Sequence, residues 1–400
     1  MEITTLEKKN RNLWVYDLEL LAGAFTYTAI NIDTQEVVSY VIHENRDERH
    51  SLKKHLNNCK GLIGFNNISF DYPIIHAFLT RYYYEVLPTE ELISKLYLKA
   101  QEIINEQNSN GFKNTTIRED NMLIPQLDLF KIWHYNNKAR STSLKSLQIS
   151  MNYPNVMDMP IHHSTTDISL DQINEILEYN LNDVLSTYEF YKKTVEFGKI
   201  DLRKAIKSKY NLPCLNWNNG KIGEQLILKL YCERTGKNFW DVRKLRSFRP
   251  YINLKDCIPN NIVFKSKEFN KLLDFYKNTT IKETKGSINE SVIYKGCKYD
   301  YGTGGLHSLH KSKVYTSNDN YIIKSCDVAS LYPNIPIVYK FWIEHLGEDF
   351  LKVYKENIVD VRLAEKNKPK KEQDKAIVDG FKQAANIPYG KSNDKDSFLF

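Results

Sequence analysis

The N-terminal part of the chain alternates apolar runs with short polar breaks. Three runs rich in apolar and β-branched residues cover Leu13 to Leu20, Ala24 to Ile32 and Glu36 to Ile42. A polar Asp-Thr-Gln turn joins the second run to the third, so the pattern predicts a three-stranded meander. A charged helical run, a short buried strand and a second helix are expected next, at 46–59, at 61–65 and from about residue 70. This order of elements indicates a mixed α/β domain.

A long helix is predicted to begin after Ser169. Ser169 and Gln172 form a capping-box pattern, and the helical spacing continues to Gly198, which suits a helix C-terminus. Tyr179 and Asp183 are four residues apart within this helix, so they are expected on one face of it.

The C-terminal half offers fewer signals. Residues 211–220 are rich in turn formers, and 224–232 has the pattern of an amphipathic helix. An apolar strand is predicted at 321–326, and two helical runs flank the charged segment 366–371. Because Pro369 prevents a single continuous helix, these runs predict a helical hairpin with a basic tip.

Composition limits the class of protein. The chain has 400 residues, of which 42% are hydrophobic, enough for two or three domains, and its net charge of +7 permits a polyanionic partner without requiring one. Its six cysteines form no C-x-x-C pair, which argues against a zinc site or a disulfide framework. No stretch approaches the roughly 18 apolar residues of a membrane span, and no signal peptide is evident, so we expect a cytoplasmic protein with no membrane partner. The abundance of Lys, Asn, Ile and Tyr fits an AT-rich genome such as that of a phage.

Acidic residues recur in three places that the predicted elements could bring together. Asp17 and Glu19 are two apart on a strand and share one of its faces, Asp71 follows a strand and opens a helix, and Tyr179 and Asp183 share a helix face. Each has an ordinary structural explanation when it is taken alone. Together they could supply the several carboxylates that phosphodiester hydrolysis by two metal ions requires.

In this order the motifs resemble the DEDDy 3'→5' exonuclease domain of family B DNA polymerases of the phage type. The resemblance implies a ribonuclease H-like fold in which the four acids hold two Mg²⁺ ions, or Mn²⁺ in their place, while the tyrosine orients the attacking water. It also implies that Asn67, Phe70, Ser143 and Leu144 hold the 3' end of single-stranded DNA. Asp128, a further acid of buried pattern, is expected to be structural.

A second set of motifs resembles the polymerase part of the same family. The segment Asp-Val-Ala-Ser-Leu-Tyr-Pro that begins at Asp327 matches motif A. The resemblance implies that Asp327 is catalytic and binds metal, that Ser330 and Leu331 contact the deoxynucleoside triphosphate, and that Tyr332 excludes ribonucleotides.

Motif B of that family is matched by Lys382, Asn386 and Tyr389, which share one helix face. By the resemblance they bind triphosphate, sugar and base. The match departs from the family at Ile387, where a serine is usual, and at Pro388, which leaves the geometry of the tyrosine open.

Two further nucleic-acid contacts are expected with less support. Arg362 would be a second triphosphate cation, although a solvated arginine explains it equally well. Gly304 and Gly305 resemble a glycine turn that approaches a template phosphate, although a plain loop is an equal alternative.

The resemblance also defines an expected domain plan. It places an exonuclease domain at 1–200, a connecting region at 201–300, a partial palm at 301–355 and a helical-hairpin fingers region at 356–400, giving an α/β and α+β chain. No Tyr-x-Asp-Thr-Asp motif with the second palm carboxylate occurs in the sequence, and the chain stops in a strand-like apolar run. We therefore expect an N-terminal fragment or one piece of a split polymerase, whose partners are DNA primer-template, single-stranded 3' ends, deoxynucleoside triphosphates and a C-terminal piece that carries that aspartate.

Three functions follow from these observations. The first is a proofreading DNA polymerase that starts from a nucleic-acid primer. Protein-primed members of the family it resembles carry a lysine between the Ser-Leu and Tyr-x-x-x-Asp motifs, and here no lysine occurs from Ser146 to Asp183. Those members also insert a subdomain between motifs A and B, and too few residues separate the two motifs here to form one. The second is a freestanding exonuclease with a vestigial polymerase half. The third is a single-strand-binding module, for which the acidic set would have no purpose.

Overall fold

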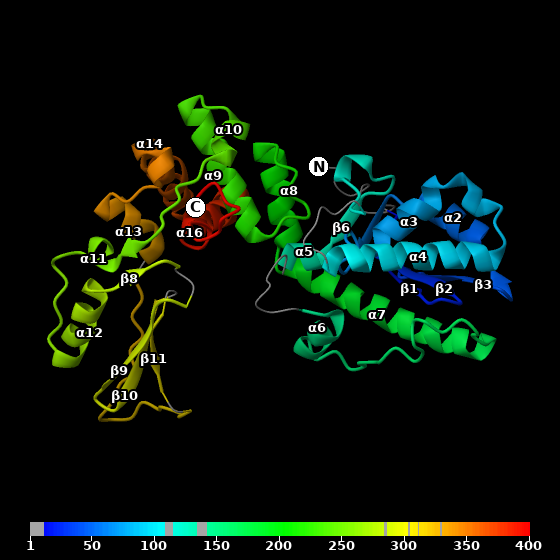
Figure 1. Cartoon of the computed structure of the whole chain (residues 1–400), viewed down its shortest axis with the longest axis horizontal. Coiled ribbons are helices and arrows are strands. Elements are labelled where there is room, and N and C mark those ends of the chain that lie inside the picture. Colours follow the sequence, from blue (N-terminus) through cyan, green and yellow to red (C-terminus); the bar gives the residue numbers. More distant parts are fainter. Residues whose placement is uncertain are drawn as a thin grey trace. The chain divides into compact units, whose positions relative to one another are not determined.

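The structure is a computed structural model of the chain, and it describes residues 12–108, 115–133, 142–283, 286–302, 305–310, 312–328 and 330–400 (Figure 1). The chain divides into two compact units. The first unit comprises residues up to 222 together with 374–380, and the second unit comprises 223–373 and 381–400.

A six-stranded mixed sheet with the order β4-β3-β2-β1-β5-β6 lies at the centre of the first unit. Its strands are β1 (Leu13–Leu20), β2 (Phe25–Asn31), β3 (Val37–His43), β4 (Arg46–Asp47), β5 (Gly61–Gly64) and β6 (Gln126–Asp128). The first four are antiparallel neighbours, and β5 runs parallel to both β1 and β6. The predicted meander and the mixed α/β class are therefore confirmed, and the arrangement is consistent with a ribonuclease H-like exonuclease fold.

Helices cover both faces of this sheet. The helices of the first unit are α2 (Arg49–Asn58), α3 (Asp71–Thr80), α4 (Thr89–Asn108), α5 (Leu129–Trp133), α6 (Leu144–Ser150), α7 (Leu170–Glu196) and α8 (Lys199–Tyr210), with the shorter η1 (Tyr82–Glu85), η2 (Glu119–Asn121) and η5 (Ala376–Gly380). The buried side chains of α2, α3 and α4 pack with alternate residues of β1, namely Trp14, Tyr16 and Leu18. Val15, on the other face of β1, packs with Val184 and Phe190 of α7, which runs along β1 and β2 (Figure 1).

The predicted long helix is confirmed as α7. Ser169 and Gln172 form both hydrogen bonds of a capping box at its first turn. Its C-cap is Phe197, and Gly198 follows with a φ of 65°, a left-handed conformation that glycine adopts without strain.

The second unit combines short helices with small antiparallel sheets. Its helices are most of α9 (Asn219–Thr235), then α10 (Phe239–Lys244), α11 (Leu254–Cys257), α12 (Lys267–Lys277), α13 (Leu331–Tyr339), η3 (Glu344–Leu346), α14 (Glu348–Lys352), the π-helical η4 (Val353–Val359), α15 (Asp360–Lys366) and α16 (Phe381–Lys391). Its strands are β7 (Ile252–Asn253) paired with β8 (Thr280–Ile281), and the meander β9 (Asn289–Tyr294), β10 (Cys297–Gly302) and β11 (Gly305–Leu309). The two predicted helical runs on either side of 366–371 are present, and they contact each other where the Tyr354 hydroxyl donates to the Ala385 carbonyl.

The prediction of strand-like structure is wrong for two segments. In 321–326 the structure has only an isolated bridge between Asn318 and Tyr321, and the side chains of Ile322 and Ile323 are 72% and 63% exposed. Among the described residues, 322–328 forms no backbone hydrogen bond with another part of the chain, so its strand propensity has no neighbour to pair with. The final apolar run, 396–400, forms turns that bury Phe398 and Leu399 instead of a strand.

In the part of the chain that the structure describes, no helix combines the length and the hydropathy needed to cross a lipid bilayer.

Candidate active site

The alternation of side chains along β1 sets the direction of its two acids. Tyr16 and Leu18 are buried beneath α2, α3 and α4, so Asp17 and Glu19 project from the opposite face, the one on which Val15 meets α7. On that side they approach Asp183 of α7. Residues far apart in the sequence therefore come together by strand alternation and the packing of one long helix.

Three carboxylates form a tight cluster at this point. Oxygen atoms of Asp17, Glu19 and Asp183 all lie within 4.8 Å of one another, and each of these side chains is half-buried. Asp71, the first residue of α3, lies outside this group but lines the same cavity. The cavity has a volume of about 350 Å³ and is lined by Asp17, Leu18, Glu19, Phe65, Asn66, Phe70, Asp71, Phe130, Thr142, Ser143, Leu144 and Asp183.

Burial disfavours the ionised form of all four acids, and repulsion from neighbouring carboxylates adds to it at Asp17 and Glu19. Burial, then the charges of Asp183 and Asp71, raise the pKa of Glu19 to about 8. Burial, then the charge of Asp128, raises the pKa of Asp71 to about 8, and burial with the neighbouring carboxylates raises the pKa of Asp17 well above its usual value. Burial likewise raises the pKa of Asp183. No lysine or arginine is among the described residues that line the cavity. Lys145, outside the lining, lowers the pKa of Asp183 by its charge. The carboxylates around the cavity are a donor set that fits hard divalent ions, whose binding releases the retained protons.

Amide side chains hold two of these carboxylates in place. Asn180 of α7 is fully buried, and its Nδ2 donates to Oδ2 of Asp17 at 2.8 Å. Gln148 of α6 is 1% exposed, and its Nε2 donates to Oδ1 of Asp183 at 2.8 Å. Neither amide was predicted from the sequence. The sequence did contain a sign of Asn180: at helical spacing it follows Ile173 and Ile176 on the buried face of α7, and it is the first polar residue on that face.

A buried carboxylate outside the cluster fixes the loop that leads to Asp71. Asp128, at the end of β6, is 0% exposed and accepts hydrogen bonds from the backbone amides of Asn66 at 3.1 Å and Ile68 at 3.2 Å. This loop connects β5 to α3, so Asp128 holds the segment that precedes α3. The expectation that Asp128 is structural is confirmed.

The side chains expected to hold a DNA 3' end occupy different positions. Phe70, Ser143 and Leu144 line the acidic cavity, and Ser143 caps α6 through a capping box with Ser146. Asn67 is instead buried, with its Nδ2 donating to Oε1 of Gln126 at 2.8 Å. Its backbone neighbour Asn66 lines the cavity in its place.

Tyr179 projects from α7 one turn before Asp183. Burial and the adjacent charges of Asp183 and Glu19 raise the pKa of its hydroxyl above the usual value, so the phenol stays protonated near neutral pH. Its hydroxyl lies close enough to the Asp183 carboxylate to favour the ionised form and so to lower the pKa of Asp183. The tyrosine is therefore a neutral donor beside the cluster.

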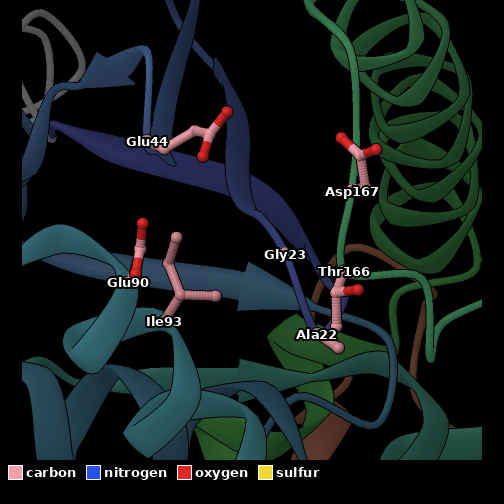
Figure 2. Close-up of a pocket in the computed structure, with 7 residues that line it drawn as sticks. All are labelled: Ala22, Gly23, Glu44, Glu90, Ile93, Thr166 and Asp167. Carbon is pink, nitrogen blue, oxygen red and sulfur yellow. The ribbon is translucent and has the colours of Figure 1, made fainter.

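A second cavity of about 420 Å³ in the same unit has a different character. Its lining residues are Ala22, Gly23, Glu44, Glu90, Ile93, Thr166 and Asp167 (Figure 2). Three acids surround it from three different segments, and among the described residues they form no metal-binding group of the kind found at Asp17. Their carboxylates point in separate directions, which leaves the first cavity as the candidate catalytic centre.

In the second unit the structure brings together two of the predicted nucleotide-binding side chains. The rings of Tyr332 and Tyr389 lie 4.7 Å apart, and the Tyr389 hydroxyl donates to the Tyr332 carbonyl at 2.5 Å. Lys382 and Asn386 are exposed on α16 together with Tyr389, as their spacing predicts for a shared face.

The other predicted residues of this unit are placed separately. Ser330 caps α13 with a φ of 52°, and Leu331 begins that helix with 47% of its side chain exposed. Asp327 is exposed, and among the described residues it joins no group of acids able to hold a metal ion. Arg362 is half-buried on α15, and Gly305 begins β11 with a φ of 138°. Gly304 lies outside the described residues.

Comparison with known families supports a nuclease in the first unit. Residues 24–212 match the model of a family described as "Predicted 3'-5' exonuclease related to the exonuclease domain of PolB". This part of the chain is similar to the exonuclease domain of PolB. The match includes Asp71, Tyr179 and Asp183 but begins after Asp17 and Glu19, so the geometry alone joins those two acids to the site. A search of curated proteins finds no match to the chain.

Proposed function

We propose that the first unit is a metal-dependent 3'→5' exonuclease that acts on single-stranded DNA ends. One observation carries the proposal: the oxygens of Asp17, Glu19 and Asp183 converge within 4.8 Å of one another in the wall of a cavity that Asp71 also lines. In this proposal these four acids hold two Mg²⁺ ions, for which Mn²⁺ can substitute. When bound, such ions supply an activated water and stabilise the leaving oxygen.

The remaining cavity residues would bind and orient the DNA end. Phe70 offers a ring on which the terminal base can stack, and Ser143 and Leu144, which line the same cavity, would contact the sugar and base. Tyr179 stays protonated beside Asp183, so its hydroxyl can donate to or orient the attacking water. The reaction class is hydrolysis of the terminal phosphodiester.

Substitution of a cluster acid tests this proposal. Asp17→Ala and Asp183→Ala each remove an anionic ligand, and we expect hydrolysis of a labelled single-stranded 3' end to fall by about 10³-fold or more. Glu90→Ala is the matched control, because it removes a carboxylate from the second cavity of the same unit. Hydrolysis at the wild-type rate in either cluster variant would show that the catalytic centre lies elsewhere.

We propose further that the chain is the N-terminal part of a family B DNA polymerase of the phage type. The observation that favours this over a freestanding exonuclease is the pairing of Tyr332 with Tyr389, which joins motif A to motif B. Residues 301–355 would then belong to the palm and 356–400 to the fingers, with 201–300 as the connection from an exonuclease domain at 1–200. Tyr332 would reject a ribose 2'-hydroxyl, and Lys382 and Asn386 would face the triphosphate and sugar.

The palm metal site is expected to need a carboxylate from another polypeptide. Among the described residues, Asp327 belongs to no group of three or more metal-ligating side chains, and a single carboxylate cannot hold two ions at the spacing that phosphoryl transfer requires. A primer-extension assay with Mg²⁺ and four deoxynucleoside triphosphates tests this. We expect no extension by the chain alone and extension when a C-terminal polypeptide with the second palm aspartate is added.

The same assay separates the two functions. Template-directed extension by the chain alone would disprove the requirement for a second polypeptide. If the chain degrades 3' ends but does not extend a primer even when the C-terminal polypeptide is added, the freestanding exonuclease is favoured. In a complete polymerase, Tyr332→Ala should relax the rejection of ribonucleotides and leave primer binding nearly unchanged, since it removes a steric clash.

A further inference from the structure

Gln148 occupies an unusual position for a polar side chain with no role in any motif. It lies on α6 with 1% of its surface exposed, and its Nε2 makes two hydrogen bonds of 2.8 Å, one to Oδ1 of Asp183 and one to Oγ of Ser186. Ser186 is itself fully buried and donates to the backbone carbonyl of Asp183 at 3.0 Å. Burying an amide is unfavourable unless it is hydrogen-bonded, and both of these bonds converge on one carboxylate residue and its helix.

The chemistry of an amide suits the neighbour of a metal ligand. The Gln148 amide is a neutral donor, so it fixes Oδ1 of Asp183 without cancelling the negative charge that attracts a cation. Gln148 bonds to Oδ1 alone, and one carboxylate oxygen of Asp183 still lies within 4.8 Å of oxygens of Asp17 and Glu19, so Asp183 remains available to the cluster. A lysine or arginine at position 148 would instead compete with the metal for the same carboxylate.

The same contact connects α6 to the acids of the cavity. Helix α6 begins at its cap Ser143, and Ser143 and Leu144 line the same cavity as the acids. Gln148 is one turn further along this helix, and its bond to Asp183 is the side-chain link from α6 to the metal-binding residue of α7. Movement of α6 would therefore displace the proposed DNA-end contacts and Asp183 together.

We propose that Gln148 is a positioning residue of the exonuclease site, which orients Asp183 for metal binding and keeps it in register with Ser143 and Leu144. This inference rests on the proposed exonuclease function. Donors to ligating carboxylates change metal affinity or activity by about 10-fold to 100-fold when they are removed. Gln148→Met keeps the length of the side chain but has no donor, so we expect an effect of that size on metal affinity.

The test measures metal binding apart from catalysis. Titration calorimetry with Mn²⁺ alone, on the full chain without DNA, should show the affinity of Gln148→Met reduced about 10-fold to 100-fold. The increase in melting temperature on adding Mn²⁺ should shrink in parallel. In a 3'-end hydrolysis assay, kcat at low Mg²⁺ should fall and should recover in part as Mg²⁺ is raised, whereas a merely structural role would lower the melting temperature without changing metal dependence.

Two further variants keep the result interpretable. Ser186→Ala is the matched control, because it removes the other partner of Gln148 and leaves the Gln148–Asp183 bond intact, so its Mn²⁺ affinity should stay within about twofold of wild type. Gln148→Asn retains an amide but is too short to reach, and it replaces the Met variant if that variant does not fold. Wild-type Mn²⁺ affinity in the folded Gln148 variant would overturn the proposal.

Asp183→Ala, measured in the same experiments, distinguishes this failure from failure of the proposed function. If Asp183→Ala loses metal binding and hydrolysis while the Gln148 variant is unchanged, only the positioning role is wrong. If Asp183→Ala itself behaves as wild type, the exonuclease site is wrong, and the role of Gln148 is refuted with it.

Discussion

Without divalent metal, the first unit should lose stability as the pH rises from about 5 to 8, and Glu19 should contribute a large part of that loss. The folded protein raises the pKa of Glu19 from 4.5 to about 8, through burial and the charges of Asp183 and Asp71. Between these two values the folded state binds more protons than the unfolded state. The free energy of unfolding therefore falls as pH rises, and the whole contribution is lost above pH 8.

The magnitude follows from the two pKa values. The difference between 4.5 and 8 corresponds to about 5 kcal/mol, at about 1.4 kcal/mol for each pH unit. About three quarters of this difference develops between pH 5 and pH 8, and solvent screening reduces it because the Glu19 side chain is only half-buried. We therefore expect about 2–3 kcal/mol between pH 5 and pH 8.

The assay compares chemical unfolding of the wild type and Glu19→Gln in EDTA across this pH range. Because the rest of the chain is the same, the difference between the two proteins isolates position 19. Glu19→Gln should gain stability relative to wild type as pH rises, and saturating Mn²⁺ should reverse the order at pH 8, since the ion stabilises the ionised wild-type cluster. Glu90→Gln, in the second cavity, is the control. A difference between wild type and Glu19→Gln that does not change with pH would refute the proposed electrostatics of the cluster.

Two substitutions and one thiol reagent test the packing of the first unit around the site. Gly23→Ala should destabilise the first unit by about 1–3 kcal/mol or more in urea unfolding, because the added Cβ would lie 2.0 Å from the Thr166 carbonyl oxygen; a neutral result would show that this loop is free to shift. Asp128→Ala should lower the free energy of unfolding by about 3 kcal/mol, because two backbone amides lose their acceptor. It should also weaken Mn²⁺ binding in calorimetry, because the loop before α3 is released, and unchanged metal binding would show that this loop does not support the site. Burial raises the pKa of Cys59 to about 12, so under native conditions a thiol reagent should modify the exposed Cys257 far faster than Cys59, as mass spectrometry of labelled peptides would show, and comparable rates would contradict the burial.

Local signals explain the parts of the fold that the sequence predicted. The alternation along Leu13–Leu20 and the capping box at Ser169 depend on residues close in sequence, and both features occur where expected. The order of the acidic motifs indicated a shared site, and the structure brings Asp17, Glu19 and Asp183 together.

Features that depend on distant partners were not predictable in this way. The bond from Asn180 to Asp17 joins residues 163 positions apart, and the bond from Gln148 to Asp183 joins residues 35 apart, so neither produces a pattern in the sequence near it. The error at 321–326 has the same origin, since strand propensity identifies a segment able to pair but does not supply its neighbour. The burial of Asn67 likewise depends on Gln126, which lies on a strand that no local signal indicated.

The run at 322–328, which forms no backbone hydrogen bond with another part of the described chain, has a practical consequence for handling the protein. A segment with exposed isoleucines and unused backbone groups can pair with the same segment of another molecule, and such pairing begins the growth of aggregates. The protein should therefore aggregate more as its concentration rises, unless another polypeptide segment pairs with this run. Lys324 lies within the run, and the repulsion between Lys324 side chains of neighbouring molecules opposes this pairing. High ionic strength screens that repulsion, so aggregation should increase with salt.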